Sequence, residues 1–274
     1  MSIEVMPDLM THEELADLAE AIKLLESRGF ASRLTGIFGS QVEAIGRALP
    51  ASARAAVAGL TENALKVALR VAIGSLDSKP GAKASNRLHK AAAAASGAIG
   101  GAFGVGALAV ELPISTTILL RSIAEIAREQ GEDLARPEGS LACFEVFALG
   151  GHAREDAAIE GGYLAVRAAL ARSVSESARF ILQQGVAGET APVVVRLISQ
   201  VAARFGVSVS QKLAAQAMPI LGAVGGAAVN TVFADHFQTM ARGHFIVRRL
   251  ERTHGADAVG FEYRRLRNEA FANA

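Results

Sequence analysis

Two long stretches without a single charged residue constrain the fold of this chain more than any other feature of its sequence. They cover residues 91–110 and 213–234 and are rich in glycine and alanine. As helices, each has about the length that crosses a bilayer or the centre of a large helical core. Glycines four residues apart, such as Gly97 with Gly101 and Gly222 with Gly226, allow two helix backbones to approach closely in either setting.

The composition favours helices along the whole chain. Of 274 residues, 51% are hydrophobic, and a chain of this size can bury a substantial core. Alanine, leucine, glutamate and arginine are strong helix formers, and no segment shows the convincing two-residue alternation of a half-buried strand. We predict an all-α protein, a compact multi-helix bundle with two central glycine-rich apolar helices.

Capping residues and prolines predict where the helices begin and end. Thr11 with Glu14 matches a capping box and predicts a first helix that ends near residue 28. Most prolines predict helix boundaries, including Pro113, after which apolar residues recur at helical spacing. Between Pro192 and residue 218, the pattern predicts two helices, with a break after Phe205.

The polar, breaker-rich residues 77–86 predict a loop or hinge. We therefore divide the chain into three parts. Residues 1–80 form an N-terminal helical part of the same domain, residues 81–255 form a helical core, and residues 256–274 form a basic C-terminal tail.

The charge balance and the cysteine count limit the partners and the compartment. The formal net charge is +1, so no global field attracts nucleic acid. Cys143 is the single cysteine and cannot form an internal disulfide, which fits a reducing compartment. The N-terminal residues lack the pattern of a secretory signal. We expect a cytoplasmic protein, with a peripheral position at the inner face of the membrane as an option.

Simple transfer energies favour packing of the glycine-rich stretches in a soluble bundle. The few large apolar residues of 91–110 contribute only about 2 kcal/mol toward insertion, so spanning would be marginal. Partial insertion and a true span remain alternatives. A basic helix carrying Arg248, Arg249 and Arg252 is a second candidate for contact with anionic lipid, against the alternative of ordinary solvated charge.

Motifs for common enzyme chemistry are absent from the sequence. It has no GxSxG, HExxH, SxxK or phosphate-binding loop, so we predict no cofactor and no metal site. His152 with Glu155 and Asp156 could offer metal ligands on one helical turn, but surface or capping roles are the simpler interpretation. Whether the protein is an enzyme stays open.

Polar residues at the ends of the two apolar stretches form the candidate site. Glu111 closes the first stretch, Asn230 interrupts the second, and Asp235 and His236 close it, while Arg121 follows Pro113. If the stretches cross, these groups could meet in a partly buried cluster, because a buried charge requires a partner. Such a cluster is either a catalytic or binding site, with Glu111, Asp235 and His236 as candidate catalytic residues, or a network that fixes helix register.

Three segments resemble the EcsC family. Residues 97–138 read GAIGGAFGVGALAVELPISTTILLRSIAEIAREQGEDLARPE, which is similar to that family's sequence of a glycine-rich run, an acidic-Leu-Pro step, an LR-I-IA helix and a G-x-DL turn. Residues 24–50 and 218–255 resemble its opening and closing segments. Glu111 departs from the aspartate expected before Leu-Pro. The resemblance implies an all-helical fold and, through the family's operon association with an ABC-type exporter, physiology linked to membranes.

These observations together predict a membrane-proximal accessory or interaction protein that contacts lipid or a membrane transporter. The alternatives are a hydrolase that uses the carboxylate and histidine cluster, and a carrier of a small apolar ligand bound between the glycine-rich helices.

Overall fold

The computed structural model describes residues 10–26, 29–48, 50–74, 105–151, 162–184, 191–216 and 222–272, and in these ranges all regular structure is helical. The all-α prediction is confirmed. The helices are α1 (His12–Leu25), α2 (Phe30–Phe38), α3 (Gln41–Ala48), α4 (Ala51–Gly74), α6 (Val105–Glu129), α7 (Pro137–Leu149), α9 (Gly162–Gln184), α10 (Pro192–Gln216), α11 (Gly222–His254) and α12 (Ala256–Ala272).

Local sequence signals explain several helix ends. The predicted capping box is present: Thr11 accepts a hydrogen bond from the backbone of Glu14, whose carboxylate accepts one from the backbone of Thr11. Pro137 and Pro192 begin α7 and α10, where a missing backbone N–H costs nothing. Gly255 separates α11 from α12 with a φ of 84°, a conformation that favours glycine.

The prediction of a helix boundary at Pro113 is wrong, because this proline lies inside α6. A proline at this position removes the backbone hydrogen bond to the carbonyl of Ala109, four residues earlier. Ala109 is exposed, so water can satisfy that carbonyl and the helix continues.

The predicted break after Phe205 is also wrong, since α10 is one helix from Pro192 to Gln216. Glycine inside a helix costs about 1 kcal/mol. Phe205 and Val209, on either side of Gly206, are fully buried, and their burial outweighs that cost.

The second glycine-rich stretch is described only in part, because residues 217–221 lie outside the described residues. Its described residues divide between the end of α10 and the start of α11. The first stretch lies outside the described residues up to position 104, and its last six residues begin α6. The residues predicted as a basic tail form α12, which packs on α1 and α11.

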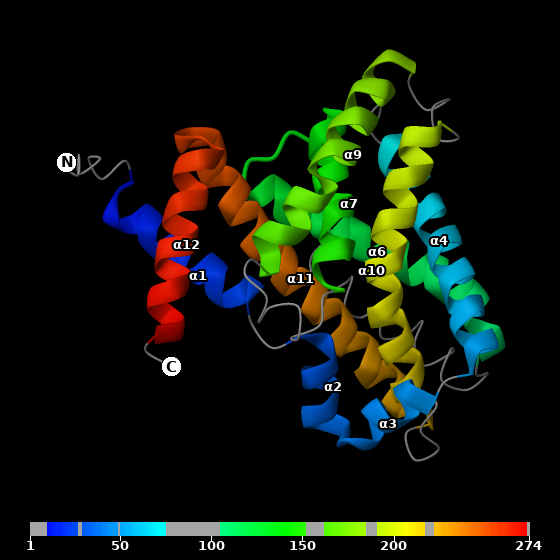
Figure 1. Cartoon of the computed structure of the whole chain (residues 1–274). Coiled ribbons are helices and arrows are strands. Elements are labelled where there is room, and N and C mark those ends of the chain that lie inside the picture. The colour runs from blue at the N-terminus through cyan, green and yellow to red at the C-terminus, as the bar shows by residue number, and fades with distance from the viewer. Residues whose placement is uncertain are drawn as a thin grey trace.

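The long helix α11 crosses the molecule and joins its two sides (Figure 1). It packs against α1 and α12 on one side and against α6, α7 and α10 on the other, while α2 and α3 close one end. Helix α7 is buried on every face except at Glu138, as its apolar sequence predicts for a helix enclosed by others.

Two glycines that the sequence pattern did not single out allow close contacts between helices. A Cβ atom at Gly243 of α11 would lie 2.6 Å from a side-chain carbon of Leu25 in α1. At Gly150, a Cβ atom would lie 2.2 Å from the ring of Phe237. This ring belongs to an aromatic cluster with Phe147 and Phe205, whose ring centroids are 4.9–5.9 Å apart. The core is therefore built around α7, α10 and α11.

Candidate functional site

The centre of the predicted polar cluster is an ion pair between α6 and α10. Nζ of Lys212 donates a hydrogen bond to Oε1 of Glu111 over 2.8 Å, and Nδ2 of Asn230 in α11 donates to the same oxygen over 3.2 Å. The side chain of Lys212 is 0% exposed and that of Glu111 5%. The ammonium also lies 4.9 Å from the ring centroid of Phe233. Glu111 and Asn230 thus meet as predicted, but around a lysine that was not part of the prediction.

This centre is closed and has little room for a substrate. Burial lowers the pKa of Lys212, while the charge and hydrogen bond of Glu111 act in the opposite direction. The cavity next to Asn230 and Phe233 has a volume of about 10 Å³, enough for about one water molecule. Because removal of one partner of a buried pair costs roughly 3–5 kcal/mol, we expect the pair to stabilise the position of α6 relative to α10.

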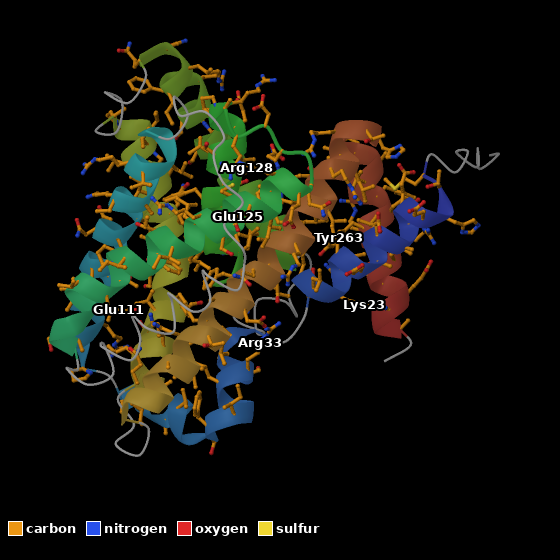
Figure 2. The ribbon with its side chains drawn as sticks, turned by 180° about the vertical axis from the view of Figure 1, so that it is seen from behind. Lys23, Arg33, Glu111, Glu125, Arg128 and Tyr263 are labelled. Carbon is orange, nitrogen blue, oxygen red and sulfur yellow. The ribbon has the colours of Figure 1, made fainter. Side chains whose placement is uncertain are left out.

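The other predicted members of the cluster lie elsewhere. Arg121 is exposed on α6. Asp235 accepts a hydrogen bond from Arg33 of α2 over 3.0 Å, and Figure 2 shows Arg33 well apart from Glu111. His236 is buried, and its Nε2 donates to the carbonyl oxygen of Gly150 over 2.8 Å. The prediction that these three residues join Glu111 is therefore wrong: α11 turns Asp235 and His236 toward α2 and α7, away from α6 and α10.

Asp235 and Arg33 line a surface groove between α2 and α11. The groove has a volume of about 460 Å³ and also contains Ile37, which is 58% exposed. Both charges in it are already paired with each other, and the side chain of Asp235 is 43% exposed. The pair therefore ties α2 to α11 at the surface.

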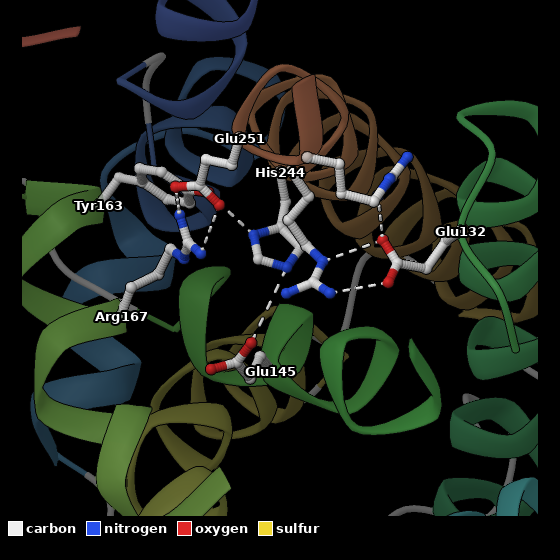
Figure 3. A network of polar contacts seen from close by, with 8 residues as sticks. Glu132, Glu145, Tyr163, Arg167, His244 and Glu251 are labelled. Atoms are coloured by element: carbon white, nitrogen blue, oxygen red, sulfur yellow. Dashed lines mark hydrogen bonds and ion pairs between the residues drawn. The ribbon is translucent and has the colours of Figure 1, made fainter. Parts of the chain in front are cut away.

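A larger polar network, which the sequence did not predict, lies where α7, α9 and α11 meet (Figure 3). Arg167 forms two hydrogen bonds of 2.6 and 2.9 Å to the carboxylate of Glu251. Arg248 forms two, of 3.0 and 2.7 Å, to Glu132, which also accepts one of 2.6 Å from Arg252. Burial alone would raise the pKa of Glu132, but the bonds and charges of the two arginines outweigh it and lower that pKa.

The arginines predicted to contact lipid are thus engaged within the protein. Arg248 and Arg252 bind Glu132, and Arg249 binds Asp17 of α1 over 2.5 Å. The basic pattern along this helix therefore has partners inside the fold.

Glu145, His244 and Tyr163 occupy the middle of the network. The Tyr163 hydroxyl lies 2.9 Å from Nδ1 of His244, and Nε2 of that ring lies 3.9 Å from Oε2 of Glu145. Burial raises the pKa of Glu145 to about 7, against the opposing charges of Arg167 and Arg248. Burial, together with the same two arginines, lowers the pKa of His244 well below its usual value.

These pKa shifts fix the proton positions in the network. His244 is neutral, and burial also raises the pKa of the Tyr163 hydroxyl, so this hydroxyl donates to Nδ1 and leaves the proton of the ring on Nε2. The N–H then faces Glu145 at a distance too long for a hydrogen bond. Glu145 is thus the group of this network whose raised pKa, about 7, places its titration near neutral pH.

Sequence reasoning missed this network, although one signal was available. Glu145 interrupts an otherwise apolar run, LACFEVFALG, and a charged residue buried in a helix needs polar partners. Those partners come from positions far apart in the chain, at residues 132, 163, 167, 244, 248 and 251. No spacing rule connects them.

Among the described residues, no group of three or more His, Cys, Asp or Glu side chains is placed to hold a metal ion. The candidate ligands His152, Glu155 and Asp156 lie outside those residues. Burial raises the pKa of Cys143 to about 12, so its thiol is protonated at neutral pH.

Comparison with known proteins gives one family and no individual relative. Neither the search of curated proteins nor the search of solved structures gave a match. The EcsC protein family, in contrast, matches residues 14–250, from within α1 to near the end of α11. The matched region holds both the Lys212 pair and the residues around Glu145. This chain belongs to the EcsC protein family.

Proposed function

We propose that this protein is a cytoplasmic, peripheral membrane accessory protein that docks on the anionic inner surface of a bilayer through the outer face of α6. One observation carries the proposal: Val110 and Ile114 are 68% and 49% exposed on the same stripe of α6 as Arg121 and Arg128. At about 100° per residue, the four positions lie within about 40° of one another. We call these four residues the α6 stripe.

The stripe has the distribution of groups that an interfacial helix needs. Its apolar residues are at the N-terminal end, and Arg121 follows Ile114 by about 10 Å along the axis. Apolar side chains of such helices enter a membrane by roughly 5–10 Å while the helix lies in the plane of the interface, and the long side chain of Arg121 can extend from there to the lipid phosphates. Neither Arg121 nor Arg128 has an acidic partner among the described residues, so both guanidinium groups are available. Figure 2 shows α6 along this side of the molecule, from Glu111 to Arg128.

The sequence just before the stripe supports the same orientation. Residues 91–109 are uncharged, and the segment before them carries Lys79, Lys83, Arg87 and Lys90 against a single acid, Asp77. A basic segment beside an apolar element favours anionic lipid by about 1 kcal/mol per basic residue near the surface.

A membrane-spanning role has weaker support. Among the described helices, α10 alone has the length and hydropathy of a span, with a mean hydropathy of 1.4. It packs against α3, α4, α7, α9 and α11, and its buried apolar residues belong to the core. The hydrolase alternative also lacks support, because Glu111, Asp235 and His236 do not face a common cavity. The carrier alternative needs a pocket between the glycine-rich stretches, and much of these stretches lies outside the described residues.

Flotation of the full-length protein with lipid vesicles tests the proposal. Wild-type protein is expected to float with phosphatidylcholine–phosphatidylglycerol vesicles and to float poorly with phosphatidylcholine alone. The double variant Val110→Ser/Ile114→Ser should lose roughly 2 kcal/mol of membrane affinity, because two partly inserted side chains are removed. The matched control is Leu182→Ser/Phe261→Ser, which changes two equally exposed apolar residues on α9 and α12. Equal flotation of the two double variants would contradict the proposal.

A further inference from the structure

A second groove lies between α9 and α10, away from the α6 stripe and from the Lys212 pair. It has a volume of about 390 Å³, within the range of roughly 300–1,000 Å³ that small-molecule sites occupy. Leu170 of α9 and Val207 of α10 form apolar parts of its wall, and Gln200 and Arg204 are polar groups on α10. Val207 is 41% exposed, so the groove presents apolar surface to a ligand.

Arg204 is a half-buried guanidinium that forms no ion pair within the described part of the chain. Its neighbours differ in this respect. Arg196, two turns earlier on α10, lies 3.9 Å from Glu176, and Arg172 on α9 forms a bond of 2.7 Å to the same carboxylate. Glu176 is thus engaged by other arginines, and no acid of the described ranges compensates the charge in the groove. An anionic ligand would complement it, most strongly as a carboxylate that accepts two parallel hydrogen bonds.

Gln200 provides a second unsatisfied group one helical turn from Arg204. Its Oε1 is buried and has no hydrogen-bond partner among the described residues. Because a buried acceptor without a donor is unfavourable, a rotation of the Gln200 side chain that brings Oε1 to a ligand N–H in the groove would be favourable. Residues four apart on a helix lie about 5–6 Å from each other, which suits a ligand whose donor and anion are on adjacent atoms.

Gly151 fixes the backbone of Arg204 in this position. A Cβ atom at Gly151 would lie 2.1 Å from the carbonyl oxygen of Arg204, so the end of α7 can touch α10 only because this residue is glycine. The close contact between Gly151 and Arg204 holds this part of the groove wall in place.

We propose that this groove binds a carboxylate that carries an N–H donor on the adjacent carbon and a short apolar side chain, as in an N-acyl amino acid or the free C-terminus of a peptide. The carboxylate binds Arg204, the N–H donates to Oε1 of Gln200, and the side chain packs between Leu170 and Val207. This site is independent of membrane docking.

Calorimetric titration of the full-length protein with N-acetyl-leucine tests the site. The wild type is expected to bind this probe, and N-acetyl-leucinamide, which lacks the carboxylate, is expected to bind at least about tenfold more weakly. Arg204→Gln should weaken binding of N-acetyl-leucine by a similar factor. Arg196→Gln, a change of the same kind on the same helix, should leave binding unchanged. Gln200→Met, which retains length but removes the acceptor, should weaken binding by a smaller factor.

The melting temperature distinguishes a loss of ligand binding from a loss of stability. Because Arg204 has no ion pair to lose, Arg204→Gln should melt at the wild-type temperature, so any loss of binding reflects the ligand contact. A peptide that ends in leucine separates the two sources: binding of both probes assigns the site to carboxyl termini in general, and binding of N-acetyl-leucine alone assigns it to a free acid. Absence of wild-type binding, or equal affinity for the acid and the amide, would overturn the proposal.

Discussion

Val110 and Glu111 are neighbours in the sequence, and each lies in the environment that the other's side chain would favour. The apolar Val110 is 68% exposed, and the carboxylate of Glu111 is buried against Lys212 and Asn230. The inner face of α6 thus uses charge to fix its position in the core. Its outer face shows apolar and basic groups without a partner in the described part of the chain. The comparison teaches that the buried polar residues hold the fold, whereas the outer face is available for function.

The largest effect on stability is expected from a substitution that breaks the Lys212–Glu111 pair on the inner face of α6. Lys212→Met should lower the free energy of unfolding by about 3–5 kcal/mol, because Glu111 is left buried with an unpaired charge. The double variant Lys212→Met/Glu111→Leu removes both charges and should recover most of this loss. Denaturant unfolding of the two variants measures the difference. A single variant as stable as the wild type would mean that the pair does not fix α6.

The pH dependence of the free energy of unfolding should distinguish the network around Glu145 from the Lys212 pair. The pKa of Glu145 is raised to about 7 in the folded protein, so its contribution to stability is present at low pH and is lost as the pH rises through 7. Between about pH 5 and pH 8 the loss amounts to roughly 2–3 kcal/mol, and Glu145→Gln should remove it. His244, whose pKa is lowered, acts in the opposite direction, because stability falls as the pH drops through its unfolded value.

Unfolding curves of the wild type and Glu145→Gln at several pH values provide the measurement. The variant should gain stability relative to the wild type as the pH rises. A constant difference across this range would show that Glu145 does not titrate near neutrality.

Substitutions on the outer face of α6 should change the affinity for membranes and should hardly change the free energy of unfolding. Arg121→Gln/Arg128→Gln is expected to weaken binding to anionic vesicles by about 2 kcal/mol, since each exposed arginine contributes about 1 kcal/mol near an anionic surface. The effect should shrink as salt is added. The free energy of unfolding should change by less than about 0.5 kcal/mol, because neither arginine has an ion pair in the described structure. Flotation over a salt series, with thermal unfolding as the control, checks both parts.

A substitution at Arg248 should lower stability and leave membrane affinity unchanged, and its effect is expected to be the smallest. The two hydrogen bonds of Arg248 to Glu132 are mostly buried, so Arg248→Gln should destabilise the fold by about 1–2 kcal/mol. Vesicle binding should remain at the wild-type level, because this arginine is engaged inside the protein. Reduced flotation at unchanged stability would restore the original interpretation of the basic helix as a lipid contact.

The sequence predicts local features of this protein better than its long-range contacts. The capping box at Thr11 and the starts at Pro137 and Pro192 follow from the chemistry of a few adjacent residues. The helix across Pro113 and the unbroken α10 do not, because burial and solvent access at distant positions outweigh local propensity.

The candidate site shows the same limit. Glu111 and Asn230 were predicted to meet because a buried carboxylate needs a donor. Lys212 was missed since lysines are almost never fully buried. Asp235 and His236 were misplaced, because one helix presents successive residues to different neighbours.

The measurement that tests membrane docking most directly is fluorescence of an environment-sensitive dye on α6. Val110→Cys, labelled with a nitrobenzoxadiazole dye, places the probe on the stripe, and the native Cys143 is buried and unreactive by its raised pKa. The account predicts a blue-shifted, brighter emission on addition of phosphatidylcholine–phosphatidylglycerol vesicles, with no change for the same dye at Leu182→Cys on α9. An unchanged spectrum at position 110 while the protein floats with the vesicles would contradict docking through α6.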